Sequence, residues 1–206
     1  MIASPIVRAH HSASGPGRGV GQVTRAARIS GPLFGRARAR YNEAFLPQGV
    51  ATMAHQHHYA ARLIWTGGEH GPTINYQSYS RDYRVEIEGK PPLEGSADPT
   101  FRGDPGRHNP EDLLVAALSA CHMLSYLAAC ARAGIEVIAY EDQASGMMAQ
   151  KEGRMRFVEV TLAPKVTIGA GDLERARGLH AKAHEDCFIA NSVSFPVLNM
   201  PTVARV

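Results

Sequence analysis

The longest apolar pattern of the chain lies at residues 113–131, which carry no charged side chain. Just before it, Asn109 can accept hydrogen bonds from the first turn of a helix, and Pro110 suits the first helical position. Glu111 and Asp112 then place negative charge at the positive end of the helix dipole. Small and apolar residues fall on nearly every face of this segment. The pattern therefore predicts a long central helix that is buried on nearly every side.

Shorter patterns on both sides of this helix predict strands and a second helix. A loop rich in Pro and Gly at residues 89–106 leads into the long helix. After the long helix, two alternating segments are joined by a turn at residues 151–153, and Asp172 caps a helix that reaches about Cys187. The predicted strands are 59–65, 73–80, 82–87, 137–149, 154–168 and 195–203. This order of elements predicts an α+β domain of two layers.

Residues 1–53 differ in composition from the rest of the 206-residue chain. They carry seven arginines, no lysine and a single acid, Glu43, and show neither helical nor alternating periodicity. The whole chain has 22 basic and 19 acidic residues, so residues 54–206 have 15 and 18. The net charge is therefore about −3 for residues 54–206 and +6 for the leader. We expect a disordered Arg-rich leader, or a start placed too early with Met53 as the true first residue, and a globular domain at 54–206. Organelle targeting and nucleic-acid binding are the alternative roles of the leader.

The chain has three cysteines, two in the long helix and one near the end of the second. Cys121 and Cys130 lie nine residues and about 180° apart around a helix, so they cannot pair with each other. Cys121 and Cys187 lie on separate elements, and geometry does not prevent their contact. Two such thiols suggest a redox pair, whereas Cys130 is expected to be a small buried apolar residue.

Three short motifs lie in the segments that carry Cys121 and Cys187. They are His108-Asn109-Pro110-Glu111-Asp112-Leu113, then Ala117-Leu118-Ser119-Ala120-Cys121, and finally Cys187-Phe188-Ile189-Ala190-Asn191-Ser192. Over roughly residues 57–206, the chain resembles the family of osmotically inducible protein C (OsmC) and organic hydroperoxide resistance (Ohr) proteins. The last motif resembles the OsmC-like branch more than the Ohr branch.

The resemblance implies an α+β, OsmC-like two-layer fold, with an antiparallel sheet and a long buried central helix in an intertwined homodimer. It implies a thiol-dependent peroxidase that reduces organic (lipid or alkyl) hydroperoxides. By motif position, Cys121 would be the peroxidatic cysteine, Cys187 the resolving cysteine and Glu111 the acidic partner. An arginine that activates the thiol is also implied: Arg102, in the loop before the helix, is favoured, and Arg81 is the alternative. The implied partners are a hydroperoxide and an external dithiol reductant, and no cofactor is expected.

Helical spacing tests one of these roles. Glu111 and Cys121 are ten residues, about 15 Å, apart along one helix, so Glu111 cannot touch the thiol of its own chain. If the two groups meet, the carboxylate comes from the other subunit. This agrees with the homodimer that the resemblance implies.

Other kinds of function also fit parts of the sequence. His180, His184 and Cys187 share one helical face and could bind a metal with Cys121, although an exposed His180 and a His184 bonded near the helix end are the simpler expectation. A non-catalytic redox-sensing or ligand-binding OsmC-like dimer would use the disulfide as a switch. A hydrolase or acyltransferase would need a base near Cys121, but His122 is turned about 100° away on the helix.

The cysteine count and the long apolar stretch bear on where the protein is located. Three cysteines without a secretory signal fit a reducing environment, so we expect a cytoplasmic protein. The long apolar stretch could span a bilayer by its length, but its leading acids, internal polar residues and many alanines favour a core helix. We therefore expect no membrane partner and no nucleic-acid partner.

Overall fold

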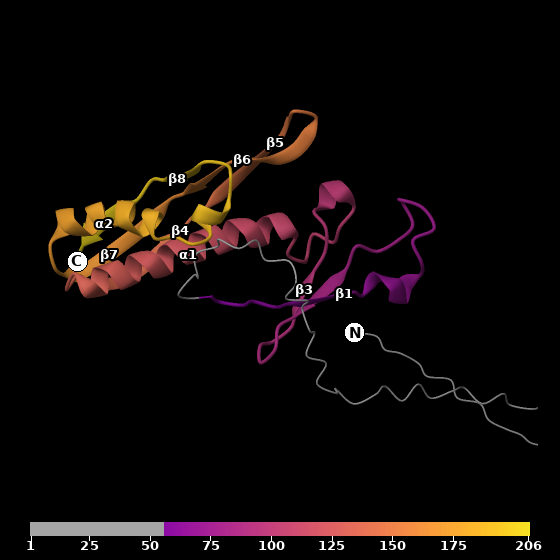
Figure 1. Ribbon diagram of the computed structural model, residues 1–206, viewed down its shortest axis with the longest axis horizontal. Coiled ribbons are helices and arrows are strands. Elements are labelled where there is room, and N and C mark those ends of the chain that lie inside the picture. Colours follow the sequence, from indigo (N-terminus) through magenta and orange to yellow (C-terminus); the bar gives the residue numbers. More distant parts are fainter. Residues whose placement is uncertain (1–55) are drawn as a thin grey trace, which may run out of the picture. The chain divides into compact units, whose positions relative to one another are not determined.

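The computed structural model describes residues 56–206, and residues 57–206 form one compact unit. The predicted leader at residues 1–53 lies outside the described residues. Within the described part, strands precede a long helix, further strands lead to a second helix, and two short strands follow it (Figure 1). This order confirms the predicted α+β class.

The strands of the described residues form three sheets of three strands each. One antiparallel sheet contains β1 (Arg62–Trp65), β2 (Tyr83–Glu86) and β3 (Leu93–Gly95). The second contains β4 (Glu136–Asp142), β7 (Pro164–Ala170) and β9 (Thr202–Arg205), and the third contains β5 (Ser145–Lys151), β6 (Arg154–Leu162) and β8 (Val197–Asn199). Because β8 pairs with β6 and β9 pairs with β7 in parallel, these two sheets are mixed rather than wholly antiparallel as predicted.

The two long strands predicted at 137–149 and 154–168 are each divided between two sheets. Asp142 stands at the division. Its carboxylate accepts a hydrogen bond from the backbone N–H of Ala163 at 2.7 Å and another from the hydroxyl of Ser119 at 2.5 Å. This side chain therefore fixes the point where the strands leave one sheet for the other, a tertiary contact that alternation along the sequence does not reveal.

The hairpin turn predicted at residues 151–153 is confirmed. Glu152 and Gly153 have φ angles of 54° and 75°, as a two-residue turn between twisted strands requires. The prediction of a strand at 73–80 is wrong, because these residues form turns and bends. There the side-chain oxygen of Asn75 accepts a hydrogen bond from the N–H of Gln77 at 2.9 Å, a local bond that competes with strand pairing. The last predicted strand is broken at Pro201, which has no N–H for a ladder.

The helix α1 (Pro110–Arg132) begins as its sequence predicts. The side chain of Asn109 accepts a hydrogen bond from the N–H of Asp112 at 2.7 Å, and the Asp112 carboxylate accepts one from the Asn109 N–H at 3.5 Å. One face of α1 is buried by its own chain. The residues of that face are Leu118, His122, Tyr126, Ala129 and Cys130. Only 28% of the most apolar stretch of α1 is buried, so burial on nearly every side is wrong for the single chain.

Among residues 56–206, α1 is the one helix that is long and apolar enough to cross a membrane. Length and composition are weak evidence for a membrane span, because a helix at the centre of a soluble protein passes the same test.

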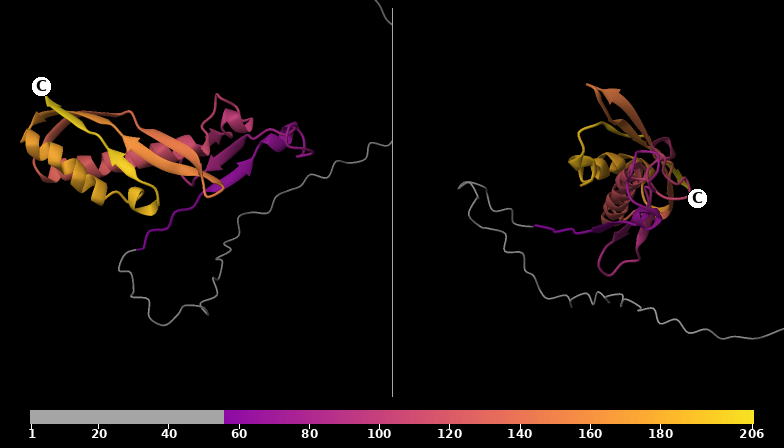
Figure 2. Two further views of the ribbon diagram at one scale, coloured as in Figure 1. Left: turned by 90° about the horizontal axis from the view of Figure 1, so that it is seen from above. Right: turned by 90° about the vertical axis from the view of Figure 1, so that its right-hand side faces the viewer.

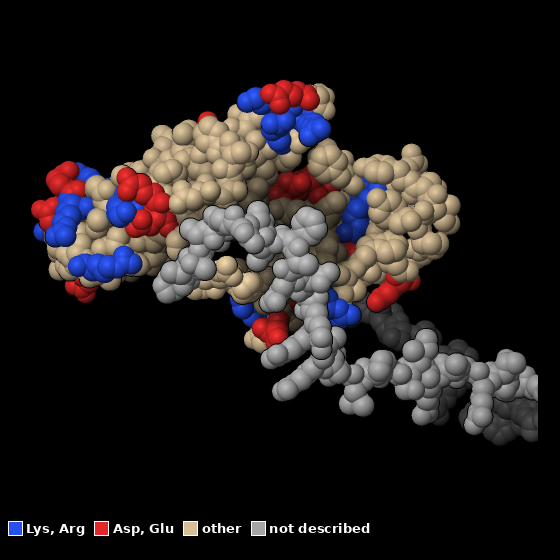
Figure 3. Space-filling model, in the orientation of Figure 1, with Lys and Arg blue, Asp and Glu red and all other residues tan. Residues whose placement is uncertain are grey.

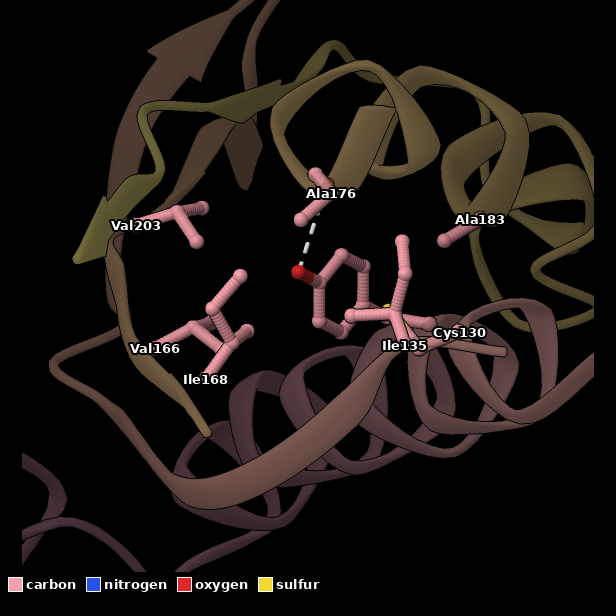
Figure 4. Packing of buried hydrophobic residues seen from close by; sticks show 8 residues of the cluster. Cys130, Ile135, Val166, Ile168, Ala176, Ala183 and Val203 are labelled. Atoms are coloured by element: carbon pink, nitrogen blue, oxygen red, sulfur yellow. Dashed lines mark hydrogen bonds between the residues drawn. The ribbon is translucent and has the colours of Figure 1, made fainter. Parts of the chain in front are cut away.

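The helix α2 (Leu173–Glu185) packs against the C-terminal half of α1, while the β1–β3 sheet lies near the N-terminal end of α1 (Figures 1 and 2). The Asp172 side chain caps α2 by accepting from the N–H of Arg175 at 2.6 Å. Between the helices, the Tyr126 hydroxyl donates to the Ala176 carbonyl at 3.2 Å (Figure 4). The buried cluster around this bond also contains Cys130, Ile135, Val166, Ile168, Ala183 and Val203.

Candidate active site

The two thiols of the predicted redox pair come together where α1 meets the end of α2. Cys121 is half-buried on α1, and Cys187 follows Asp186, the C-terminal cap of α2. Cys187 is 1% exposed, and its thiol lies next to that of Cys121. Both cysteines are free thiols in this structure. A contact between residues 66 positions apart in sequence therefore rests on the packing of α2 against α1.

The surroundings of the two thiols differ. Burial, followed by the neighbouring thiol of Cys121, raises the pKa of the Cys187 thiol above its ordinary value. The backbone N–H of Ala190, 3.5 Å from the sulfur, acts in the opposite direction. Cys187 is thus held as a protonated thiol in a closed position, while Cys121 is the more accessible of the two sulfurs.

Cys121 opens into a hollow of about 760 Å³ between α1 and the end of α2. The apolar side chains of Leu124 and Phe188 stand at this hollow, and they are 62% and 78% exposed. The other lining residues are Ala117, Ala120, Ser125, Ala128, Arg132, Glu185, Asp186 and Asn191. The hollow beside this accessible thiol therefore has mainly small and apolar side chains, together with the charged groups of Arg132, Glu185 and Asp186.

Glu111 lines a different hollow, of about 800 Å³, between the N-terminal half of α1 and the β5–β6 hairpin. Acidic side chains are visible inside it (Figure 3), and its carboxylates are those of Asp98, Glu111, Asp112 and Asp142. Its apolar residues include Phe101, Met123, Met148, Met155 and Phe157. Within one chain, the carboxylate of Glu111 and the thiol of Cys121 therefore face different spaces, as their helical spacing predicts.

The two arginines considered for thiol activation have different surroundings. The Arg81 guanidinium donates to the carbonyl oxygens of Tyr76 and Tyr79 and lies 3.9 Å from the Tyr79 ring centre, so it is engaged within its own loop. Arg102 is exposed and follows Phe101, which lines the same hollow as Glu111. Its φ of 70° is the left-handed conformation that residues other than glycine rarely adopt. Neither arginine lines the hollow beside Cys121.

The expectation of an exposed His180 is wrong. His180 is 2% exposed, and its Nδ1 lies 3.1 Å from Nε2 of His122, which is fully buried. His180 also stacks on the Tyr126 ring, with 3.8 Å between ring centres. Sequence reasoning missed this pair, although a histidine within an apolar helix and a second one on the capped helix were the available signals.

Burial is the main cause of altered titration in this pair. It lowers the pKa of His180 to about 4, and the neighbouring His122 adds to the shift. The pKa of His122 is lowered too, first by burial and then by His184, while Asp142 acts in the opposite direction. Both imidazoles are therefore neutral near pH 7.

The metal hypothesis based on His180, His184 and Cys187 lacks a geometric basis. In the part of the chain that the structure describes, no three His, Cys, Asp or Glu side chains are arranged to hold a metal ion. His180 turns toward His122, and Cys187 contacts Cys121. His122 points into the interior between the helices rather than toward Cys121, so it is poorly placed as a base for that thiol.

The described part of the chain is thus an α+β domain in which the thiols of Cys121 and Cys187 lie next to each other. Residues 103–198 match the family model described as OsmC-like protein. A solved OsmC-like protein of unknown function from Vibrio cholerae is 31% identical, with a TM-score of 0.66, and the match covers 71% of this chain and all of that one. The chain belongs to the OsmC-like protein family, as the motifs around Cys121 and Cys187 indicated.

More distant structures share the fold. An organic hydroperoxide resistance protein from Elizabethkingia anophelis is 24% identical, with a TM-score of 0.55 over 75% of this chain and 100% of that one. An OsmC-like protein from Mycoplasma pneumoniae is 14% identical, with a TM-score of 0.55 over 74% of this chain and 99% of that one. A comparison with curated proteins finds no match.

Proposed function

We propose that this protein is a thiol-dependent peroxidase that reduces organic hydroperoxides through a two-cysteine cycle. The observation that carries the proposal is the contact between Cys121 and Cys187, one accessible and one buried. The distant relative from Elizabethkingia anophelis, named as an organic hydroperoxide resistance protein, supports the same reaction class.

In the first step, the thiolate of Cys121 attacks the distal oxygen of the hydroperoxide. The O–O bond breaks, the sulfur is oxidised to a sulfenic acid, and the leaving alkoxide takes up a proton to become an alcohol. In the second step, the sulfur of Cys187 attacks the sulfenic sulfur. An S–S bond forms, the S–O bond breaks, and the hydroxyl leaves with the Cys187 proton as water.

The raised pKa of Cys187 suits the second role rather than the first. Because the nucleophile in these reactions is a thiolate, a buried and protonated thiol reacts poorly with a free peroxide. Attack on the adjacent sulfenic acid is intramolecular, so contact with Cys121 favours that reaction by proximity. Cys121 is therefore the peroxidatic cysteine and Cys187 the resolving one.

Glu111 and Arg102 complete the proposed site from the second subunit of a homodimer. Glu111 lines the hollow beside the β5–β6 hairpin, Arg102 follows Phe101 of the same hollow, and neither residue lines the hollow beside Cys121 of its own chain. An arginine next to Cys121 would favour the thiolate, and a carboxylate would orient that arginine through paired hydrogen bonds. Arg102 is preferred to Arg81, because the Arg81 guanidinium is bound within its own loop.

The proposed substrates are hydroperoxides with an apolar organic group. Leu124 and Phe188 present exposed apolar surface next to Cys121, which would bind such a group and would gain nothing from hydrogen peroxide. Reduction of the Cys121–Cys187 disulfide requires an external dithiol, and the cycle uses no cofactor. A reducing cytoplasm would supply such a dithiol.

The test is steady-state reduction of cumene hydroperoxide with a dithiol reductant, using the wild-type chain and three cysteine variants. Cys121→Ser should abolish turnover, and Cys187→Ser should stop recycling after one sulfenate per chain. Cys130→Ala is the matched control, because Cys130 lies in the core on the far side of α1 from Cys121, and it should retain turnover. Unchanged rates in either of the first two variants would refute the two-cysteine cycle. Stoichiometric disulfide formation without turnover would instead indicate a redox-sensing dimer.

A further inference from the structure

The buried pair of His122 and His180 lies next to the thiol pair but takes no part in the proposed chemistry. Going along α1, Cys121 meets Cys187, His122 meets His180, and Tyr126 meets Ala176. The partners, on α2 and just after its end, thus occur in reverse order, so the two helices run in opposite directions. The histidines form the polar contact next to the thiols in this series.

A third side chain also reaches this pair. His122 Nε2 lies 3.1 Å from the Asn199 amide group and 3.1 Å from His180 Nδ1. Since a neutral imidazole nitrogen is either a donor or an acceptor, the tautomers of the two rings decide which of them donates in this contact. Within residues 56–206, His122 Nδ1 and His180 Nε2 are buried without a hydrogen-bond partner.

Such an arrangement is costly for stability alone. A buried polar group without a partner lowers the free energy of unfolding, a loss that an apolar contact between the helices would avoid. A buried polar pair does, however, favour one alignment of two helices over others, because any shift breaks its bonds. Ala176, His180 and Ala183 are the buried residues of α2, and Cys187 follows its C-terminal cap, so the histidine pair fixes the half of the helix that leads to this thiol.

The alignment matters because disulfide formation has narrow geometric limits. The two Cα atoms must lie about 4.4–6.8 Å apart, whereas sliding α2 by one helical turn would move Cys187 by about 5.4 Å. We propose that His122 and His180 are positioning residues that hold Cys187 against Cys121 for the disulfide-forming step. This inference rests on the proposed function for its role in the cycle, but the positioning itself can be tested without a peroxide.

Paired variants separate the hydrogen bond from simple loss of packing. His180→Asn keeps a hydrogen-bonding amide at the place of Nδ1, and His122→Gln keeps one at the place of Nε2. His180→Leu removes one partner of the hydrogen bond, and the double variant His122→Leu with His180→Leu replaces the pair by an apolar contact that can still pack. Tyr126→Phe is the matched control, because it removes one buried hydrogen bond between the same helices, further from the thiols.

Two rates are measured on the reduced full-length chain. Sulfenate formation with cumene hydroperoxide is followed by trapping with a dimedone probe, and disulfide formation by rapid acid quench. Closure of the Cys121–Cys187 disulfide is also measured with diamide, which oxidises two thiols to a disulfide while it is reduced to a hydrazine. We expect His180→Leu and the double leucine variant to close the disulfide about tenfold more slowly, as loss of one buried hydrogen bond implies. Sulfenate formation should be unchanged.

His180→Asn and His122→Gln should restore the rate of closure, and Tyr126→Phe should leave it near that of the wild type. Closure with diamide at the wild-type rate in the double leucine variant would overturn the inference. Closure in the wild type with diamide but not with hydroperoxide would refute the proposed peroxidase, while the comparison of variants would still decide the positioning role. If His180→Leu does not fold, the double leucine variant and His180→Asn provide the comparison.

Discussion

At the scale of single residues, the site depends on two identical side chains in different surroundings. Cys121 is accessible on α1, and Cys187 is closed off after α2, where burial raises the pKa of its thiol. The sequence identified both cysteines and predicted that Cys130 would be a buried apolar residue, which is confirmed. It could not predict the contact between Cys121 and Cys187, because that contact is set by helix packing rather than by any local pattern.

A prediction at this scale concerns the loop that carries Arg102. The N–H of Gly103 donates to the Asp98 carbonyl at 3.1 Å, and a Cβ at Gly103 would overlap the Ala97 carbonyl. Gly103→Ala must therefore displace Arg102, destabilise the protein by about 1–3 kcal/mol and reduce peroxidase turnover. Urea unfolding and steady-state assays check the two effects. Gly106→Ala, whose Cβ would meet only the Asp104 side chain, is the control and should be tolerated. Full turnover in Gly103→Ala would argue against the role of Arg102.

At the scale of elements, the two helices and their caps follow from local rules, whereas the divided strands do not. Asn109 and Asp172 mark the helix starts in sequence and cap them in the structure. The break between β4 and β5 depends on Asp142, which bonds Ser119 and Ala163 from distant segments. The histidine pair was missed for the same reason: each histidine stands in an ordinary helical position, and only the docking of α2 on α1 brings them together.

The docking of α2 on α1 should depend on pH through His180. Its pKa falls from 6.5 to about 4 on folding, chiefly because burial disfavours the charged form. As the pH drops, His180 therefore binds a proton in the unfolded chain before it does so in the folded protein. The folded protein has its full free energy of unfolding from this group above about pH 6.5 and loses it as the pH falls to about 4. The loss from His180 is on the order of 3 kcal/mol. His122 contributes in the same direction.

Urea unfolding of the wild type and of His180→Asn between pH 7 and pH 4 measures this effect. The carboxylates titrate in both proteins, so the difference between the two curves reports the histidine. We expect the free energy of unfolding to fall more steeply in the wild type than in His180→Asn as the pH decreases. Parallel curves would mean that His180 is not neutral and buried in the folded protein.

At the scale of the whole molecule, α1 is the element that its own chain leaves incompletely covered. Only 28% of its most apolar stretch is buried, and the exposed positions Ala116, Ala120 and Leu124 follow each other at four-residue spacing on one side. The proposed homodimer accounts for this surface and for the separation of Glu111 from Cys121. A second subunit on that side would bury α1 on nearly every face, as the apolar pattern of its sequence predicts.

Leu124→Glu places a charge on this exposed stripe, so it should convert the proposed dimer to a monomer, and it should also abolish turnover because Leu124 lines the hollow beside Cys121. Sedimentation velocity and the steady-state assay measure the two effects. Ile74→Glu is the control, because Ile74 is 78% exposed and belongs to the segment between β1 and β2 rather than to α1. A monomeric wild type, or a dimeric and active Leu124→Glu variant, would exclude a site shared between subunits on this surface.

The most direct test of the two-cysteine cycle is a thiol count on the fully reduced protein before and after one equivalent of cumene hydroperoxide, with peptide mapping of any disulfide. The proposed cycle predicts rapid loss of two thiols per chain, with one disulfide that joins Cys121 to Cys187 and Cys130 left reduced. Retention of all thiols, or oxidation confined to Cys130, would contradict it.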